Sequence, residues 1–151
     1  MLLYHGSPGI GKTYFCSAIA EWALQNFDSI RYHHEKNLLA RLRQGISDGS
    51  GDYERNLGYL IDDELVILDD VGSGINPNKC NNRDLEWRRE IFFGFLDYRY
   101  NSMKPTIITS NFTQNDFMEI YSGRICSRLF ANENTIISVF GDDLDKRQKG
   151  L

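Results

Sequence analysis

The chain has 151 residues, of which 41% are hydrophobic and 25% are charged, and its formal net charge is −4. This length fits a single domain, and the composition excludes a disordered or collagen-like chain. The acidic balance excludes a protein that coats duplex DNA through an overall positive charge, so contact with nucleic acid would require a local basic patch.

No apolar run is long enough to span a membrane, and no secretory pattern opens the chain. The three cysteines, Cys16, Cys80 and Cys126, are widely and irregularly spaced. This spacing argues against a disulfide framework or a zinc knuckle and is typical of a reducing compartment. We therefore expect a cytoplasmic protein without a membrane partner.

Short apolar stretches alternate with amphipathic ones, which predicts an α/β fold with a mainly parallel sheet. The expected strands are residues 1–5, 29–34, 65–68, 105–109 and 136–140. The expected helices are residues 12–26, 37–42, 53–61 and 85–100, with Asp84 as the cap of the last, and Thr113 with Asp116 opens one more. Segments 45–52 and 72–82 are expected to be loops, and the charged tail from Gly141 to be loosely ordered.

A glycine-rich segment between the first expected strand and helix matches the pattern G-x-x-x-x-G-K-[ST] completely. Its glycines let backbone amides surround phosphate oxygens, and the helix that follows directs its positive end at them. In this pattern Lys12 contacts the β- and γ-phosphates, and the Thr13 hydroxyl ligates Mg²⁺. The alternative is a turn that only joins strand to helix. The predicted ATP-binding residues are Gly6, Ser7, Pro8, Gly9, Ile10, Gly11, Lys12, Thr13 and Tyr14.

The apolar strand 65–68 is followed by two carboxylates, Asp69 and Asp70. Ligands of open α/β sheets bind at the carboxyl ends of the strands, so both acids are expected near the phosphate loop. Asp69 is predicted to contact Mg²⁺ through water, and Asp70 to polarise the attacking water as a general base. Alternatively, these acids only cap the turn after the strand.

Together these residues resemble an AAA+ ATPase of the DnaC-type replicative helicase loader family, which has IstB-like relatives. Residues 98–111 resemble the family's segment leading into sensor 1, residues 124–129 its arginine-finger helix, and the paired aspartates its Walker B strand. The resemblance covers essentially the whole chain. It implies a P-loop NTPase fold of the AAA+/RecA-like kind, with about five parallel strands flanked by helices.

The resemblance also implies roles for single residues. Asn111 corresponds to sensor 1, where an amide could hold the lytic water and sense the γ-phosphate. Arg128 corresponds to the arginine finger, which would act on a neighbouring subunit, with Arg124 one helical turn earlier. The alternatives are a turn-initiating Asn111 and a surface helix with two ordinary arginines.

Compared with the family, we expect this sequence to lack two parts. The helicase-binding region that usually precedes the first strand is absent, so we expect one AAA+ domain over residues 1–151. A full C-terminal lid is also not expected, because about ten residues follow the last strand and Arg147 is the only arginine among them.

Three arginines, Arg41, Arg43 and Arg55, fall where related initiators and loaders insert helices that grip single-stranded DNA. Tyr53 and Tyr59 are candidate stacking partners, and the alternative is a solvated helical face.

The sequence therefore predicts an ATP-hydrolysing helicase loader of DNA replication in a bacterial or phage-infected cell, with ATP and Mg²⁺ as cofactors. Its expected partners are a hexameric replicative helicase, single-stranded DNA and further copies of itself. An IstB-type transposition helper, a non-catalytic nucleotide-binding remnant and a small-molecule kinase are the alternatives. The kinase is disfavoured because Gly-Thr does not follow Lys12 and no arginine-rich lid is evident.

Overall fold

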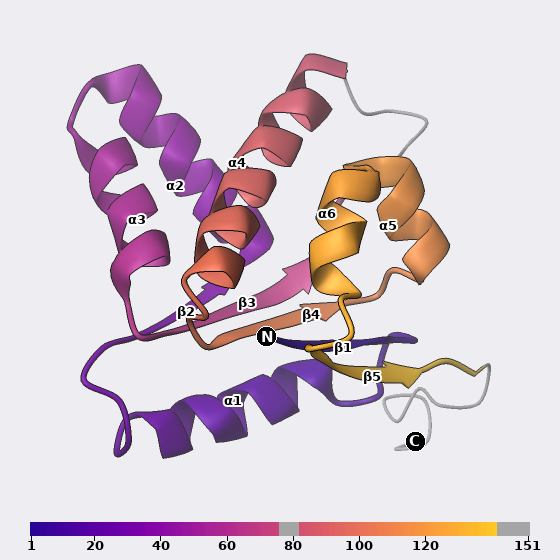
Figure 1. The fold of residues 1–151 in the computed structure, drawn as a ribbon. Coiled ribbons are helices and arrows are strands. Elements are labelled where there is room, and N and C mark those ends of the chain that lie inside the picture. Colours follow the sequence, from indigo (N-terminus) through magenta and orange to yellow (C-terminus); the bar gives the residue numbers. More distant parts are fainter. Residues whose placement is uncertain (76–81, 142–151) are drawn as a thin grey trace, which may run out of the picture.

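A computed structural model describes residues 1–75 and 82–141. Five parallel strands form one sheet in the order β2-β3-β4-β1-β5. Helix α1 covers one face of the sheet, and the other described helices cover the opposite face (Figure 1). The predicted α/β fold is confirmed. Among the described residues, no helix has both the length and the apolar content needed to cross a membrane.

The strands are β1 (Leu2–Gly6), β2 (Ile30–His34), β3 (Leu65–Val71), β4 (Thr106–Ser110) and β5 (Thr135–Val139). The helices are α1 (Lys12–Ala23), α2 (Glu35–Asp48), α3 (Asp52–Asp62), α4 (Asn82–Asn101), α5 (Gln114–Tyr121) and α6 (Gly123–Leu129). Residues 76–81 of the predicted polar loop and residues 142–151 of the predicted tail, with Arg147, lie outside the described residues.

Two predicted features, the loop 45–52 and the cap of α4, differ in the structure, and a third is confirmed. The expected loop 45–52 is mostly helical, because α2 continues to Asp48 and the chain turns at Gly49 and Gly51, both with positive φ. Asp84 lies inside the first turn of α4 and is not its cap. The expected cap at Thr113 is confirmed as a capping box, in which Thr113 and Asp116 each bind the other's backbone amide.

The interior strand β3, between β2 and β4, is buried on both faces, as expected of a parallel strand covered by helices. Val66 and Leu68 pack among the helices on one side, and Leu65 and Ile67 pack against α1 on the other. Because all strands are parallel, the carboxyl ends of β1, β3 and β4 meet at one edge of the sheet. The phosphate loop, the paired aspartates and Asn111 follow these strands, so the fold brings them together.

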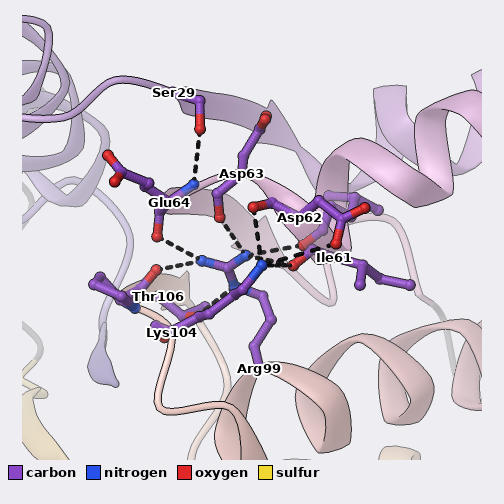
Figure 2. Close-up of polar contacts among 10 residues, drawn as sticks. Ser29, Ile61, Asp62, Asp63, Glu64, Arg99, Lys104 and Thr106 are labelled. Atoms are coloured by element: carbon purple, nitrogen blue, oxygen red, sulfur yellow. Dashed lines mark hydrogen bonds and ion pairs between the residues drawn. The ribbon is translucent and has the colours of Figure 1, made fainter.

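The buried Arg99 near the end of α4 ties helix α3 to the sheet (Figure 2). Its guanidinium donates to the carbonyl oxygens of Leu60, Ile61, Asp63, Glu64 and Pro105 and to the Thr106 hydroxyl, at 2.6–3.2 Å. Lys104 Nζ adds bonds of 2.9 Å to the carbonyls of Ile61 and Asp62. These cations lie at the C-terminal end of α3, where helix carbonyls lack partners and the helix dipole is negative. Much of segment 98–111 therefore has a structural role that the sequence analysis missed.

Candidate nucleotide-binding site

A hollow of about 390 Å³ opens at the carboxyl edge of the sheet, where β1 gives way to α1. Six of the nine predicted phosphate-loop residues line it, together with Asp70 and Asn111: Pro8, Gly9, Gly11, Lys12, Thr13 and Tyr14. Gly6, Ser7 and Ile10 complete the loop. The structure thus gathers residues from three separate parts of the sequence around one space. Their contact with ATP stays a prediction.

The loop has the backbone that phosphate binding needs. Gly9 and Gly11 adopt φ values of 80° and 96°, in the left-handed region that favours glycine. Gly11 is the N-cap of α1, and no side chain of the described residues caps this helix end. A Cβ on Gly11 would meet none of the described atoms within 4 Å, so the described part of the chain leaves open space at this point. The free helix N-terminus and this space fit the phosphates of a nucleotide.

The Lys12 side chain is held close to the loop. Its Nζ donates to the carbonyl oxygens of Gly6 at 2.8 Å and Ser7 at 2.9 Å, and the residue is largely buried. Lys12 also lines the hollow, so its ammonium group is stationed beside the space where phosphates would lie. Gly6 itself has no room for a side chain, because a Cβ there would be 2.0 Å from the Val139 carbonyl oxygen in β5.

Asp70 reaches the hollow through an irregularity in β3. The register between β3 and β4 shifts between Leu68 and Val71, and Asp70 has a φ of 59°, which is unusual for a residue with a side chain. Its backbone amide donates to Thr109 Oγ1 at 2.9 Å, and Asn111 Nδ2 donates to Asp70 Oδ1 at 3.0 Å. The predicted general base and the predicted sensor are therefore hydrogen-bonded neighbours.

Asp69 lies behind the hollow and is fully buried. Its carboxylate accepts from the Tyr32 hydroxyl at 2.7 Å and from the Thr109 hydroxyl, and His34 Nδ1 lies 3.3 Å away. Burial and the hydrogen bond to Asp69 raise the pKa of Tyr32, which keeps this phenol a donor. Any contact of Asp69 with a metal would thus be indirect, and the contact itself stays a prediction.

The donors around the hollow fit Mg²⁺ bound mainly by phosphate and water. No group of three or more His, Cys, Asp or Glu side chains placed to hold a metal occurs among residues 1–75 and 82–141. The Thr13 hydroxyl and the Asp70 carboxylate are hard oxygen groups of residues that line the hollow. Mg²⁺ usually keeps several waters and takes few protein ligands beside substrate phosphates, so this sparse set is sufficient.

The two arginines of α6 lie against α4. Arg128 Nε donates to Asp97 Oδ1 at 2.7 Å and Nη2 binds the same oxygen. The guanidinium groups of Arg124 and Arg128 stack on the Phe93 ring, 4.4 and 4.8 Å from its centroid. Neither arginine lines the hollow of its own chain. A finger role for Arg128 would therefore concern a neighbouring subunit.

The three arginines predicted to contact DNA lie in two different places, and their contact with DNA stays a prediction. Arg41 and Arg55 line a second hollow of about 390 Å³ between α2 and α3, where Tyr59 also lies. Arg43 instead donates to Asp84 on α4 at 2.9 Å and stacks on Trp87, 4.8 Å from the ring centroid. Residues two apart on a helix face different sides, which separates Arg43 from Arg41.

The two tyrosines predicted as stacking partners, Tyr53 and Tyr59, also lie in different surroundings. Tyr53 is partly buried and packs against the hydrophobic core. Tyr59 lines the second hollow, and the Arg31 guanidinium lies over its ring at 4.3 Å.

One buried acid near the site was missed by the sequence analysis. Glu35, the first residue of α2, is 2% exposed and lies among buried leucines. The sequence carries a signal for it, because Glu35 stands at helical spacing from Leu38, Leu39 and Leu42. A lone carboxylate on the apolar face of a helix requires specific partners.

The fold and the arrangement of this site define an AAA+ ATP-binding protein of the P-loop class. The profile of the family described as "IstB-like ATP binding protein" matches residues 1–148. The chain belongs to this family.

The relatives include an insertion-sequence protein and a helicase loader. An insertion-sequence IS1162 ATP-binding protein of Pseudomonas fluorescens is 38% identical over 109 residues, which cover 72% of this chain and 42% of that protein. A replicative helicase loader DnaC of Buchnera aphidicola (strain Bp) is 21% identical over 98% of this chain and 57% of its own length. The chain thus spans about half the length of these relatives.

Solved structures agree with this placement. A DnaC helicase loader superposes with a TM-score of 0.70 at 26% identity, covering 90% of this chain and 77% of the other. DnaI gives a TM-score of 0.70 at 27% identity, covering 95% of this chain and 71% of the other. A DnaA initiator bound to AMPPCP and single-stranded DNA shares the fold, with a TM-score of 0.73 at 19% identity over 93% of this chain and 40% of its own.

Proposed function

We propose that this domain binds ATP with Mg²⁺, hydrolyses it, and uses the cycle to help place a ring helicase on single-stranded DNA. The observation that carries the hydrolytic part is the pairing of Asp70 with Asn111 on the wall that also holds Lys12 and Thr13. A carboxylate and an amide side by side can together orient a water molecule for attack on a phosphorus atom.

Each residue has a distinct task in this proposal. The loop amides and Lys12 bind the phosphates, and the Thr13 hydroxyl takes one position on Mg²⁺. Mg²⁺, when bound, neutralises charge on the phosphate oxygens. Asp70 accepts a proton from water, and Asn111 fixes the orientation of the Asp70 carboxylate through its hydrogen bond to Oδ1.

Two substitutions test binding and hydrolysis separately. Lys12→Ala is expected to weaken ATP binding roughly 10- to 100-fold in calorimetry, because it removes hydrogen bonds from a charged donor.

Asp70→Asn is expected to bind ATP normally and to lose turnover, because an amide cannot take a proton from water. Asp62→Asn, an exposed change of the same kind, is the control. Turnover at the wild-type rate in Asp70→Asn would show that β3 is only structural, and a wild type that binds but never hydrolyses ATP would identify a non-catalytic remnant.

The partner is tested by competition between two candidates. The DnaC-like structures favour a replicative helicase, and the 38% identity to an insertion-sequence protein favours a transposition helper as the second candidate. We expect the chain to co-purify with a hexameric replicative helicase in the presence of ATP. Capture of an IS21-type transposase in place of the helicase would select the second candidate.

The contact with single-stranded DNA is proposed for the hollow that Arg41 and Arg55 share. Arg41→Ala combined with Arg55→Ala is expected to weaken binding and to reduce the salt slope by roughly one per lost phosphate contact. Arg43→Ala is the matched control, because Arg43 pairs with Asp84 away from this hollow. Equal salt slopes for the wild type, the double variant and Arg43→Ala in anisotropy titrations would show that the hollow is an ordinary solvated surface.

A further inference from the structure

The buried carboxylate of Glu35 joins three elements around the end of β3. Its Oε2 accepts the backbone N–H of Gly72 at 2.8 Å, and its Oε1 accepts the Tyr121 hydroxyl at 2.6 Å. Arg88 Nη1, from α4, lies 3.8 Å from Oε2. Gly72 is two residues beyond Asp70, so one end of this carboxylate is bonded to the turn that carries the predicted general base.

The turn after Asp70 is tightly restrained on the side of β4. Gly72 has a φ of 86°, and a Cβ there would lie 2.2 Å from the Phe112 ring. Ser110 Oγ donates to the Val71 carbonyl at 2.6 Å, and the amide of Ser73 donates to the Asp70 carbonyl at 3.1 Å. Glu35 supplies the corresponding restraint from the side of α2.

We propose that Glu35 is a positioning residue for Asp70: by accepting the Gly72 N–H, it fixes the turn that directs the Asp70 carboxylate into the nucleotide hollow. This inference rests on the proposed hydrolysis. Asp70 depends on such support because its left-handed backbone is unfavourable for a residue with a side chain and persists only where its surroundings fix it. A displacement of about 1 Å in a group that orients a reactant can lower the rate about 100-fold.

A purely structural role of Glu35 makes a different prediction from a positioning role. The hydrogen bonds of Glu35 with Gly72 and with Tyr121 distinguish the two roles. If Glu35 only links helices, loss of the Tyr121 bond and loss of the Gly72 bond should act alike, through stability alone. If Glu35 positions Asp70, only loss of the Gly72 bond should reduce kcat. ATP affinity should stay unchanged in both cases, because Glu35 does not line the hollow.

The experiment compares three variants of the full chain. Glu35→Met fills a similar volume but has no acceptor, and we expect kcat to fall roughly tenfold or more while the Kd for ATP stays within about twofold. Glu35→Gln retains an acceptor oxygen for Gly72 and is expected to keep most of the wild-type kcat. Tyr121→Phe removes the other bond and is the matched control, with the wild-type kcat expected. Hydrogen exchange at the Gly72 amide should accelerate in Glu35→Met alone.

Each outcome decides a different point. Should Glu35→Met fail to fold, Glu35→Asp carries the same expectation, because its carboxylate is one methylene too short to reach Gly72. A wild-type chain without turnover overturns the proposed hydrolysis and this inference together. An active wild type whose kcat is matched by Glu35→Met or Glu35→Asp overturns the role of Glu35 alone, and so does an equal loss of kcat in Tyr121→Phe.

Discussion

His33 in β2 occupies surroundings that oppose its protonated form. Burial lowers the pKa of His33 to about 4, and the positive charges of Arg41 and Arg31 act in the same direction. In the unfolded chain the imidazole has its ordinary pKa near 6.5, so the unfolded state binds a proton first as the pH falls. The contribution of His33 to stability is therefore complete above about pH 6.5 and decreases toward pH 4.

This linkage predicts a measurable pH dependence. The free energy of unfolding should decrease by at most about 1.4 kcal/mol per pH unit below pH 6.5 because of this one residue. Urea titrations of the wild type and of His33→Gln at pH 7 and pH 5 measure the difference, since glutamine does not titrate. If both proteins lose the same stability between these pH values, the effect belongs to other groups.

Single residues also show where sequence reasoning succeeds and where it stops. The phosphate loop was predictable because its glycines and Lys12 occupy fixed spacings within one short segment. For Asp70 and Asn111, the sequence predicted only that both residues lie at the same edge of the sheet, and not that they are hydrogen-bonded. The bulge that turns Asp70 into the hollow was not predictable, because it depends on a hydrogen bond that the Asp70 amide donates to Thr109 in another strand. The carbonyl partners of Arg99 could not be predicted either, because residues such as Asp63 lie far from Arg99 in the sequence.

At the scale of elements, α2 and α3 cross closely at Gly45. A Cβ on Gly45 would lie 2.5 Å from the backbone nitrogen of Tyr53, so this helix position excludes a side chain. The sequence analysis interpreted Gly45 as part of a loop because segment 45–52 is rich in glycine, serine and aspartate. The structure shows that it serves close packing between two helices.

Two alanine substitutions test this interpretation. Gly45→Ala is expected to destabilise the protein by about 1–3 kcal/mol, the usual cost of overpacking. Gly58→Ala in α3 is the matched control, because a Cβ there meets nothing within 4 Å. It should stabilise the protein by up to about 1 kcal/mol through helix propensity. Equal effects of the two changes in thermal or urea unfolding would contradict the close crossing.

The attachment of α3 through Arg99 leads to a stronger prediction. Arg99→Met should lower the free energy of unfolding by at least about 3 kcal/mol, because several buried carbonyl groups lose their donor and each costs about 1–3 kcal/mol. Arg55→Met removes an exposed ion pair with Asp52 and should cost less than about 1 kcal/mol. A loss in Arg99→Met no larger than in Arg55→Met would show that water replaces the guanidinium.

At the scale of the whole molecule, the placement of Arg128 predicts how activity depends on assembly. Arg128 is bound to Asp97 and lies outside the hollow of its own chain, so its catalytic use requires a second subunit. An arginine supplied by a partner raises phosphoryl-transfer rates by about 10³–10⁵. Turnover per subunit should therefore rise with protein concentration, and Arg128→Ala should bind ATP normally but lose that rise.

A dilution series of steady-state ATPase rates, run with sedimentation to follow association, makes this measurement. Arg124→Ala is the companion variant, because Arg124 stacks on the same Phe93 ring without the bond to Asp97. Constant turnover per subunit across the series, with Arg128→Ala as active as the wild type, would show that one chain holds a complete site.

The place of β1 in the sheet has a consequence for the order in which the domain is made. β1 leaves the ribosome before the other strands of this sheet, yet its neighbours are β4 and β5, and Leu2 pairs with Ile107 and Thr135. Pairings so distant in sequence form late, because the intervening chain must first be ordered. The Ser7 amide donates to the Val139 carbonyl at 2.9 Å, so the phosphate cradle is finished only when the last strand docks. During synthesis the whole phosphate motif would therefore be present long before it could bind a nucleotide. Because ATP would bind only the folded form, it would shift the equilibrium of the last folding step toward that form.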